Sequence, residues 1–570
     1  MKTVNFLLAF VVSIVSLTGL WSCKTDTPGD PYSSDSLVLQ NGQGLFGKHC
    51  SSCHNFYHDD IAPQLANITA HQTFGWIKSF ISNPDQVIKS GDTTAAKLFA
   101  EYKTTMPPFS FLPEADLTSI ISYIHSQRQP VQVPDVPDTT DLKNPIPDTI
   151  ENSNITVEVT QFSQVPKSSE DVPLTRIIKL DFIPNSGDLY VLDLRGKLYK
   201  LTNGEPQVYM DITKLRPRFM HEPGMATGFG SFAFHPDFQS NGLFYTTHAE
   251  SVGSGQPDFA YDSIIVTLQW VLTEWKTTPG AFPFNGSGRE ILRINMPTSI
   301  HGMQEIAFNR TAKKGDSEYG LLYVCVGDGG CTSIGKRVVS EVPNKIWGSI
   351  LRIDPLGKNS SNGQYGIPAN NPFVDSHDGK LAKEVYAYGF RNPHRLSWSK
   401  KGQLFAVNIG ERSIESVNLI EPGHFYGWPL REGTFSERFF NGTGRTFPLP
   451  ANDSIYHVTY PVAQFDHGEG TAICGGFEYT GSLIDELKGK FVFGDIGTGK
   501  LFYVSMSDLK QGHQAKIRKW NLSQNGSPTS LAKLCGNSRV DMRYGVDDKG
   551  ELYILTKADG RIYKLVNRVK

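Results

Sequence analysis

The sequence contains one compact run typical of a covalent cofactor site, Cys50-Ser51-Ser52-Cys53-His54. Two cysteines three positions apart, followed at once by histidine, are the attachment pattern of a c-type haem. Each thiol adds to one vinyl group of the haem, and the adjacent imidazole can bind the iron. A redox-active CxxC pair and half of a zinc site are the alternatives. Zinc is disfavoured because no second CxxC or Cys/His cluster lies nearby. We therefore predict haem c, attached through Cys50 and Cys53.

Residues 36–128 must position this haem, and their pattern predicts a small all-α domain. Gly42, Leu45 and Phe46 lie on helical spacing just before the haem motif. A second helix is predicted after Pro113, with apolar residues at three- and four-residue steps up to Ile124. A proline-rich loop, Met106-Pro107-Pro108, lies between the two helices.

The two predicted helices resemble the first and last helices of class I cytochromes c. By that resemblance, His54 and Met106 are the axial ligands of the haem iron. A methionine ligand leaves a coordinated, higher-potential iron, which suits electron transfer rather than oxygen binding. The histidines that compete with Met106 for the second ligand position are His49, His58 and His71.

Residues 156–570 carry a recurring phrase in which glycine precedes an aromatic residue or a leucine–aromatic pair by one or two positions. The copies begin at Gly187, Gly242, Gly320, Gly402, Gly489 and Gly550. Each copy is the pattern of a turn that leads into a β-strand. Six such modules predict an all-β six-bladed β-propeller. The copies are farther apart than the roughly 40 to 45 residues of a minimal blade, so we expect long loops on one face. A sandwich or two all-β domains is the alternative.

The loops between these predicted strands carry the rarest residue combinations, and they resemble the glucose/sorbosone dehydrogenase family. The most specific stretches are residues 233–238, 389–393, 426–433 and 545–553. The resemblance covers most of residues 170–567. It implies a soluble quinoprotein sugar dehydrogenase fold, a six-bladed propeller that binds pyrroloquinoline quinone (PQQ) and a calcium ion in a central cavity.

Carried across position by position, the resemblance implies roles for five residues. His301 matches the catalytic histidine of the family. Arg391 and Asn392 match the pair that contacts the quinone. Gly410 and Glu411 fall where backbone carbonyls bind calcium, a kind of ligand that imposes little identity on the side chain.

Two features depart from the family pattern. Ile300 stands directly before His301, where the sugar-oxidising members carry a polar residue. After Gly327-Asp328, the polar side chain expected over the cofactor is not evident. Further polar residues of these loops are expected to be structural or to line the cavity, and no role is assigned to them: Asp328, His394, Glu305 and His424.

These residue types suit the oxidation of a sugar hydroxyl. Imidazole is a base that works near neutral pH. No side chain accepts a hydride, so an organic cofactor is required. An arginine and a divalent cation suit the carboxylates of an acidic quinone. We therefore predict a quinohaemoprotein oxidoreductase that passes electrons from the anomeric hydroxyl of an aldose through PQQ to the haem. The alternatives are a dehydrogenase of non-sugar alcohols and a carbohydrate- or protein-binding propeller without the cofactor.

The N-terminus predicts export from the cytoplasm. Residues 1–22 combine Lys2 with an apolar run that is short for a membrane span, the pattern of a signal peptide. Leu20-Trp21-Ser22-Cys23 resembles a bacterial lipoprotein processing box, so we expect Cys23 to be lipidated and residues 23–35 to be a polar tether. Ordinary signal cleavage nearby is the alternative. The expected location is the periplasmic or cell-surface face of a bacterial membrane, with a periplasmic or membrane-bound electron acceptor.

The length, composition and net charge of the chain limit its domain organisation and its partners. The 570 residues exceed one ordinary core, so two or more domains are expected. Residues 129–155 are rich in proline, which predicts an extended, semi-rigid linker between them. The net charge of −2 does not predict nucleic-acid binding. Four of the seven cysteines have no assigned role, and they are either disulfide-bonded or buried thiols: Cys325, Cys331, Cys474 and Cys535.

Overall fold

The structure of this chain is a computed structural model. It describes residues 31–51, 53–54, 56, 62–102, 105–127, 141–223, 226–260, 266–331, 346–376, 382–440 and 443–567. The predicted signal peptide, Cys23, the tether up to residue 30 and the linker up to residue 140 lie outside these ranges. Within the described ranges, no helix has the length and apolar character needed to cross a membrane.

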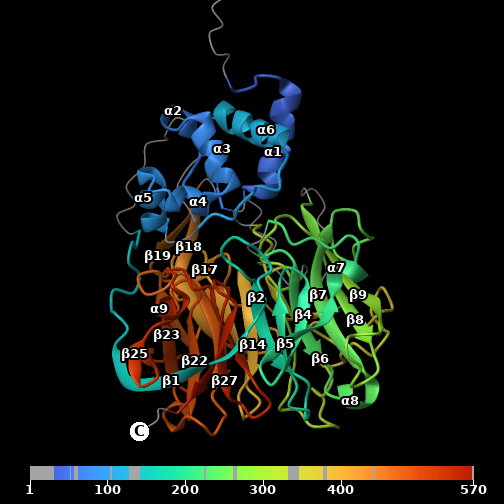
Figure 1. Cartoon of the computed structure of the whole chain (residues 1–570). Helices are drawn as coiled ribbons and strands as arrows, with labels where there is room; N and C mark the ends of the chain where they lie inside the picture. Colours follow the sequence, from blue (N-terminus) through green and yellow to red (C-terminus); the bar gives the residue numbers. More distant parts are fainter. Residues whose placement is uncertain are drawn as a thin grey trace, which may run out of the picture.

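The N-terminal region is helical, as the sequence predicts. Its helices are α1 Ser36–His49, α2 Ile68–His71, α3 Phe74–Ser82, α4 Pro84–Lys89, α5 Thr93–Tyr102 and α6 Glu114–Ser126. Figure 1 shows this haem domain (residues 36–127) seated on one end of the β-rich remainder, with α4 and α5 on the side that faces the strands.

Helices α1 and α6 pack closely because Gly42 has no side chain. A Cβ at this position would lie 2.0 Å from the backbone oxygen of Ser119 and 2.8 Å from the Cβ of Tyr123. Phe46, on the same helix, is buried against Ile120 and other apolar residues of this small core. The haem motif follows directly after α1, so this helix pair fixes where the motif begins.

The remainder is mostly β-sheet, and four of its sheets contain four antiparallel strands each. The first consists of β2 Ile177–Phe182, β3 Leu189–Asp193, β4 Lys197–Thr202 and β5 Glu205–Asp211. The second consists of β6 Phe229–Phe234, β7 Leu243–Ser251, β8 Leu268–Lys276 and β9 Ser287–Met296. The third consists of β10 Glu305–Phe308, β11 Leu322–Val326, β12 Ser349–Ile353 and β13 Val385–Tyr388. The fourth consists of β14 Asn392–Trp398, β15 Leu404–Ile409, β16 Ile414–Ile420 and β20 Ala463–Asp466.

A nine-stranded sheet contains two further runs of four. One run is β21 Ile473–Glu478, β22 Lys490–Asp495, β23 Leu501–Ser505 and β24 Arg518–Gln524, with β25 Ser527–Thr529 paired to β24. The other is β26 Met542–Val546, β27 Leu552–Thr556, β28 Arg561–Val566 and β1 Asn152–Gln164. Strand β1 pairs antiparallel with β28 and parallel with β24, so the first strand of the domain holds its last strands in place.

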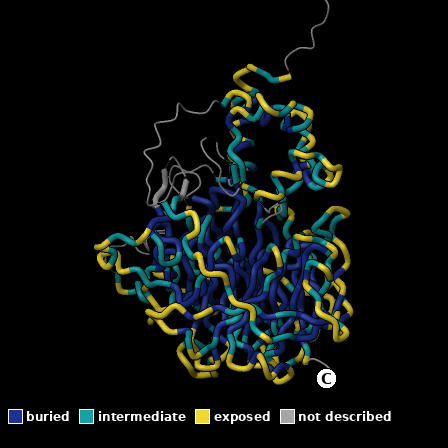
Figure 2. The backbone as a smooth tube through the Cα atoms, turned by 90° about the vertical axis from the view of Figure 1, so that its left-hand side faces the viewer, coloured by how far each residue is buried: buried dark blue, intermediate teal, exposed yellow. Residues whose placement is uncertain are grey.

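The smaller elements lie in the connections. A three-stranded sheet is formed by β17 Arg431–Glu432, β18 Phe435–Phe440 and β19 Thr443–Phe447. The short helices are α7 Ile212–Leu215, α8 Phe238–Asn241, α9 Leu531–Cys535, η2 Asp453–Tyr456 and η3 Asp485–Leu487. Figure 2 shows that the buried backbone is concentrated in the β domain (residues 152–567).

The repeated glycine phrase marks the same turn in every run of four strands. Each copy leads into the second strand of its run, namely β3, β7, β11, β15, β22 and β27. All six glycines have φ between 64° and 79°, a region that side chains with a Cβ rarely adopt. The predicted turn-to-strand module is therefore confirmed, and the glycine is required by the backbone conformation of the turn.

The second half of the predicted linker is part of the β domain rather than a spacer. Strand β1 begins at Asn152, inside the range 129–155. Before it, Leu142 N donates to Thr446 O at 2.8 Å, and Ile150 N donates to Glu469 Oε1 at 2.8 Å. The prolines prevent regular pairing, yet the amides between them find acceptors on the domain surface. Residues 142–155 of the predicted linker therefore belong to the β domain.

Candidate functional site

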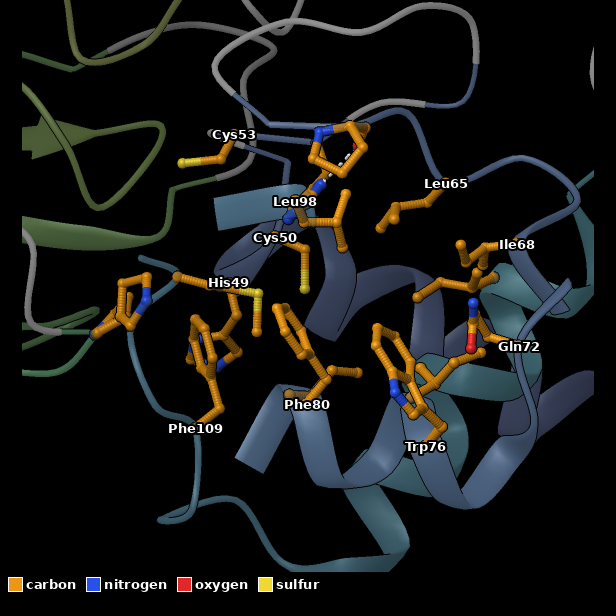
Figure 3. Close-up of a pocket in the computed structure, with 18 of the residues that line it drawn as sticks. His49, Cys50, Cys53, Leu65, Ile68, Gln72, Trp76, Phe80, Leu98 and Phe109 are labelled. Carbon is orange, nitrogen blue, oxygen red and sulfur yellow. Dashed lines mark hydrogen bonds between the residues drawn. The ribbon is translucent and has the colours of Figure 1, made fainter. Parts of the chain in front are cut away.

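A cavity of about 180 Å³ lies among the helices of the haem domain. Its lining includes Cys50, Cys53, His54 and Met106, the four residues predicted to hold the haem. The rest of the lining is largely apolar, and Figure 3 shows Trp76, Phe80, Leu98 and Phe109 around the two cysteines. Thioether attachment and an apolar surrounding are what a haem c requires, so these residues fit the group.

The orientation of His54 suits iron binding. Its Nδ1 lies 2.8 Å from the carbonyl oxygen of Pro63. Because a carbonyl only accepts, Nδ1 carries the proton, and Nε2 keeps its lone pair for a metal. Burial lowers the pKa of His54, against the smaller effect of this hydrogen bond, so the neutral, ligating form of the ring is favoured.

The three histidines that compete with Met106 lie in different surroundings. His49 lines the same cavity and packs edge-on against Phe109, with ring centroids 6.0 Å apart. Burial, aided by Lys48, lowers the pKa of His49 to about 4. His71 is exposed at the end of α2, and His58 lies outside the described residues. Met106 lines this cavity and an adjoining one that shares Cys53 and His54.

Met106→Ala tests the second ligand. We expect the haem to stay attached, because its thioethers are unaffected, and its midpoint potential to fall, because methionine ligation raises the potential. A spectroelectrochemical titration of the haem bands measures this shift. Met506→Ala, in the β domain, is the matched control. A Met106→Ala variant with the wild-type potential would show that Met106 does not bind the iron.

In the β domain, His301 forms a buried pair that the sequence did not predict. Its Nδ1 lies 2.7 Å from Asp328 Oδ1. Asp328 also accepts hydrogen bonds from Trp428 Nε1 at 3.0 Å and from the Gly330 amide at 2.8 Å. His301 has φ +54°, a conformation that costs energy for a residue with a side chain and recurs at functional sites. The carboxylate therefore holds the imidazole in one orientation and leaves Nε2 as the nitrogen that can take a proton.

The charges around this pair favour a neutral imidazole. Burial, then the positive charge of Arg391, lowers the pKa of His301, and Asp328 opposes this shift. Burial alone would raise the pKa of Asp328, but His301 and Arg391 lower it by more. A neutral histidine held by an ionised aspartate is a suitable general base near neutral pH.

The predicted quinone-binding pair lies beside His301. The Asp328 amide donates to the Arg391 carbonyl at 2.8 Å, which joins the two loops. Asn392 is buried, and its Oδ1 has no hydrogen-bond partner among the described residues. An unsatisfied buried amide oxygen is costly, so it is the kind of group that a bound ligand satisfies.

One of the two predicted calcium ligands, the Gly410 carbonyl, is already hydrogen-bonded within the protein. Arg391 Nη1 donates to the Gly410 carbonyl at 2.6 Å, so a guanidinium already lies at the oxygen expected to bind the metal. The next four amides, from residues 411 to 414, all donate to Glu432 Oε1 at 2.8–3.1 Å. Within the described ranges, no group of three or more His, Cys, Asp or Glu side chains is arranged to hold a metal. Calcium is therefore assigned no role in the reaction.

A buried cationic cluster near His301 is the second feature that the sequence did not reveal. His394, Arg543 and Lys557 are buried, and both ring nitrogens of His394 and the Arg543 Nε have no partner among the described residues. Burial first, and then neighbouring positive charges, lower the pKa of His394 and of Lys557 well below their ordinary values. Asp541 offsets this charge only in part. A ligand that carries several carboxylates would satisfy such a cluster, as PQQ would.

The other unassigned residues have structural roles or lie outside the site. Glu305 forms buried ion pairs with Lys179 and Arg395. His424 is exposed, with its Nδ1 2.9 Å from Thr459 Oγ1. Among the spare cysteines, Cys325 and Cys474 are buried unpaired thiols, Cys535 is a partly exposed one, and Cys331 is buried.

Asp328→Asn tests the pairing with His301. Because Asp328 raises the pKa of His301, its removal lowers that pKa further, and the acid limb of the pH profile of the predicted sugar oxidation is expected to move to lower pH. We expect the rate at the optimum to fall about 10- to 100-fold, since the ring loses its orienting partner. The exposed Asp485→Asn serves as the control. A profile that moves to higher pH would contradict the pairing.

Comparison with known proteins identifies both parts of the chain. The family model of cytochrome c matches residues 39–128, so the helical region is a cytochrome c domain. The family model described as Glucose / Sorbosone dehydrogenase matches residues 174–564, which is more than half of the chain. This chain belongs to the glucose/sorbosone dehydrogenase family.

Sequence identity to the individual proteins described next is below 25%. HIPL1 protein of Arabidopsis thaliana is 24% identical over 386 residues, or 60% of this chain and 53% of the plant protein. Human Hedgehog-interacting protein is 23% identical over 407 residues, or 68% of this chain and 49% of the human one. The chain thus spans about half the length of these relatives. The soluble aldose sugar dehydrogenase (Asd) of Escherichia coli, solved in its apo-form, aligns with a TM-score of 0.51 at 18% identity, over 72% of this chain and 100% of that one. This last likeness concerns the fold.

Proposed function

We propose that this chain is a quinohaemoprotein sugar dehydrogenase. It oxidises the anomeric hydroxyl of an aldose or a related sugar, with PQQ as the hydride acceptor and haem c as the outlet for electrons. The observation that carries the proposal is the buried His301–Asp328 pair, with the cationic cluster beside it. This pair lies in a member of a sugar dehydrogenase family that also carries a cytochrome c domain.

Within this proposal, each residue of the site has one physical task. His301 accepts the hydroxyl proton at Nε2, and Asp328 stabilises the imidazolium that forms. Asn392 and Arg391 would contact the quinone. The cluster residues Arg543 and Lys557 would neutralise its carboxylates. When bound, PQQ supplies the hydride acceptor that no side chain provides.

The haem domain is the proposed route by which electrons leave the oxidation site. Cys50 and Cys53 would attach the haem, and His54 and Met106 would bind its iron. When bound, haem c would supply a one-electron acceptor from which a periplasmic or membrane-bound carrier could be reduced. Because the acceptor is tethered to the dehydrogenase, its effective concentration at the site is high.

We further propose that the six runs of four strands are the blades of a six-bladed propeller. The supporting observation is that the first strands of four separate sheets contact one another. Lys179 on β2 binds Ser231 on β6 and Glu305 on β10, and Glu305 also binds Arg395 on β14. First strands from four separate sheets converge in this way around a propeller axis. A two-sheet sandwich would not bring them together.

A binding propeller is the second candidate function, and the similarity to Hedgehog-interacting protein is the observation that favours it. The cytochrome c domain favours the enzyme, since a binding module has no electrons to deliver. Titration of the protein with PQQ, followed by its melting temperature, separates the two. We expect PQQ to raise the melting temperature and to confer aldose-dependent reduction of an added dye. Protein that neither binds PQQ nor reduces the dye with any aldose or simple alcohol would be a binding module.

Export and lipidation are proposed from the sequence alone. Residues 1–22 would direct export, and Cys23 would carry the lipid that anchors the protein to a bacterial membrane. Metabolic labelling with a radioactive fatty acid tests the anchor. Label that appears in the wild type and is lost in Cys23→Ser supports it, whereas an unlabelled wild type indicates ordinary signal cleavage.

A further inference from the structure

The cavity of the haem domain is not closed by that domain alone. Three residues of the β domain also line it, namely Pro223, Ser299 and Ile300. They come from the loops before β6 and before β10. Ser299 is 4% exposed and Ile300 is 7% exposed in the complete chain, so both are covered. One wall of the haem cavity is thus built from the loop that also carries His301.

This wall is held firmly in the β domain. Thr227 Oγ1 donates to the Ser299 carbonyl at 2.9 Å, and Thr298 Oγ1 donates to the Gly329 carbonyl at 2.8 Å. The loop of Pro223 is held by Arg176, whose Nη1 donates to the His221 carbonyl at 3.2 Å. Because these contacts lie within the β domain, the wall is preformed for the haem domain to dock on.

A second contact region supports the same docking. Asp85 on α4 of the haem domain is partly buried, and burial raises its pKa. Lys89 and the β-domain residue Arg539 lower this pKa, whereas Asp171 and Asp541 of the β domain raise it. Arg539, Asp171 and Asp541 all belong to the β domain, so α4 lies close to that domain, at charges of both signs. Figure 1 shows α4 on the side of the haem domain that faces the strands.

We infer that the haem domain docks with its haem crevice against the Ser299–Ile300 corner, and that Ile300 is a positioning residue that seals the crevice beside His301. The inference rests on the proposed function, because the purpose of the docking is to place the haem next to the site of sugar oxidation. It also explains why position 300 is apolar. A polar side chain there would be buried against an apolar cavity without a partner, whereas isoleucine keeps the contact dry.

The test is the haem midpoint potential of quinone-free protein, measured with a chemical mediator. Ile300→Asp places a negative charge at the crevice, which stabilises the ferric haem, so we expect the potential to fall at low ionic strength and the shift to shrink with added salt. Ser299→Asp should act in the same direction, which guards against one variant that fails to fold. Ile300→Leu should leave the potential unchanged. Leu356→Asp, an exposed leucine outside the cavity lining, is the matched control and should also have no effect.

The outcomes separate this inference from the proposed function. If both Ile300→Asp and Ser299→Asp keep the wild-type potential while Met106→Ala shifts it, the docking is wrong and the haem assignment stands. If the aspartate variants shift the potential but PQQ does not bind, the docking stands and the proposed reaction is wrong. A shift of the same size in Leu356→Asp would also overturn the docking, because the effect would then report net charge alone.

Discussion

His301→Ala is expected to lower kcat/KM for an aldose by about 10²- to 10⁴-fold, the usual contribution of a general base. The haem spectrum should be unchanged, since His301 does not line the haem cavity. The loss follows from the geometry of the pair. Asp328 holds Nδ1, so Nε2 is the base, and alanine leaves no group in its place. Steady-state dye reduction with the PQQ-loaded protein measures the effect.

The matched control is His424→Ala, which removes an exposed loop histidine that is hydrogen-bonded to Thr459. Its rate should stay within about twofold of the wild type, as surface substitutions are usually well tolerated. The acid limb of the pH profile of the wild-type rate gives a second check. Because the pKa of His301 is lowered, the wild-type rate should fall only below pH 6.5, the ordinary value for the ring. A His301→Ala variant with the wild-type rate would remove this residue from the mechanism.

Glu305→Ala is expected to lower the free energy of unfolding of the β domain by about 3–5 kcal/mol, the cost of breaking a buried ion pair. Glu305 is 2% exposed, and its partners Lys179 and Arg395 are 6% and 5% exposed. Lys179 also donates to the Ile306 carbonyl at 2.8 Å, and Arg395 donates to the Ile178 carbonyl at 2.9 Å. Removal of the carboxylate leaves Arg395 without this counter-ion and leaves Lys179 with only the more distant Asp181, at 3.9 Å, where four sheets meet.

Urea denaturation followed by tryptophan fluorescence measures this loss, while haem absorbance reports the helical domain separately, because the two domains need not unfold together. Glu170→Ala is the control. Its pair with Lys167 is exposed, with 81% of the Glu170 side chain accessible, so at most about 1 kcal/mol should be lost. Equal midpoints for the two variants would contradict the role given to the buried cluster.

The features that the sequence predicted well are those set by local spacing. The haem motif is five consecutive residues, and its chemistry does not depend on what lies far along the chain. The glycine phrase likewise reports one tight turn, whose positive φ demands glycine each time it recurs. Helices α1 and α6 follow from their own periodicity, and the close approach at Gly42 accounts for the glycine in the first of them.

The features that the sequence missed depend on contacts between distant residues. Asp328 lies 27 positions from His301, and only the fold brings their side chains together. The cationic cluster joins His394 on β14 with Arg543 on β26. The local signal for Asp328 was its position after Gly327 at the end of β11. This signal is weak, because aspartate is common in turns that follow strands. The apolar Ile300, a departure from the family pattern, gains a reason only from the docked haem domain.

The most direct test of the central claim is the absorption of the haem on mixing with a sugar. Protein loaded with PQQ is mixed anaerobically with a panel of aldoses in a stopped-flow spectrometer, and the haem bands are recorded. We predict that the haem becomes reduced with at least one aldose, that the reduction requires PQQ, and that it is lost in His301→Ala. Haem that stays oxidised with every aldose, although PQQ is bound and a chemical reductant reduces the haem, would contradict the account.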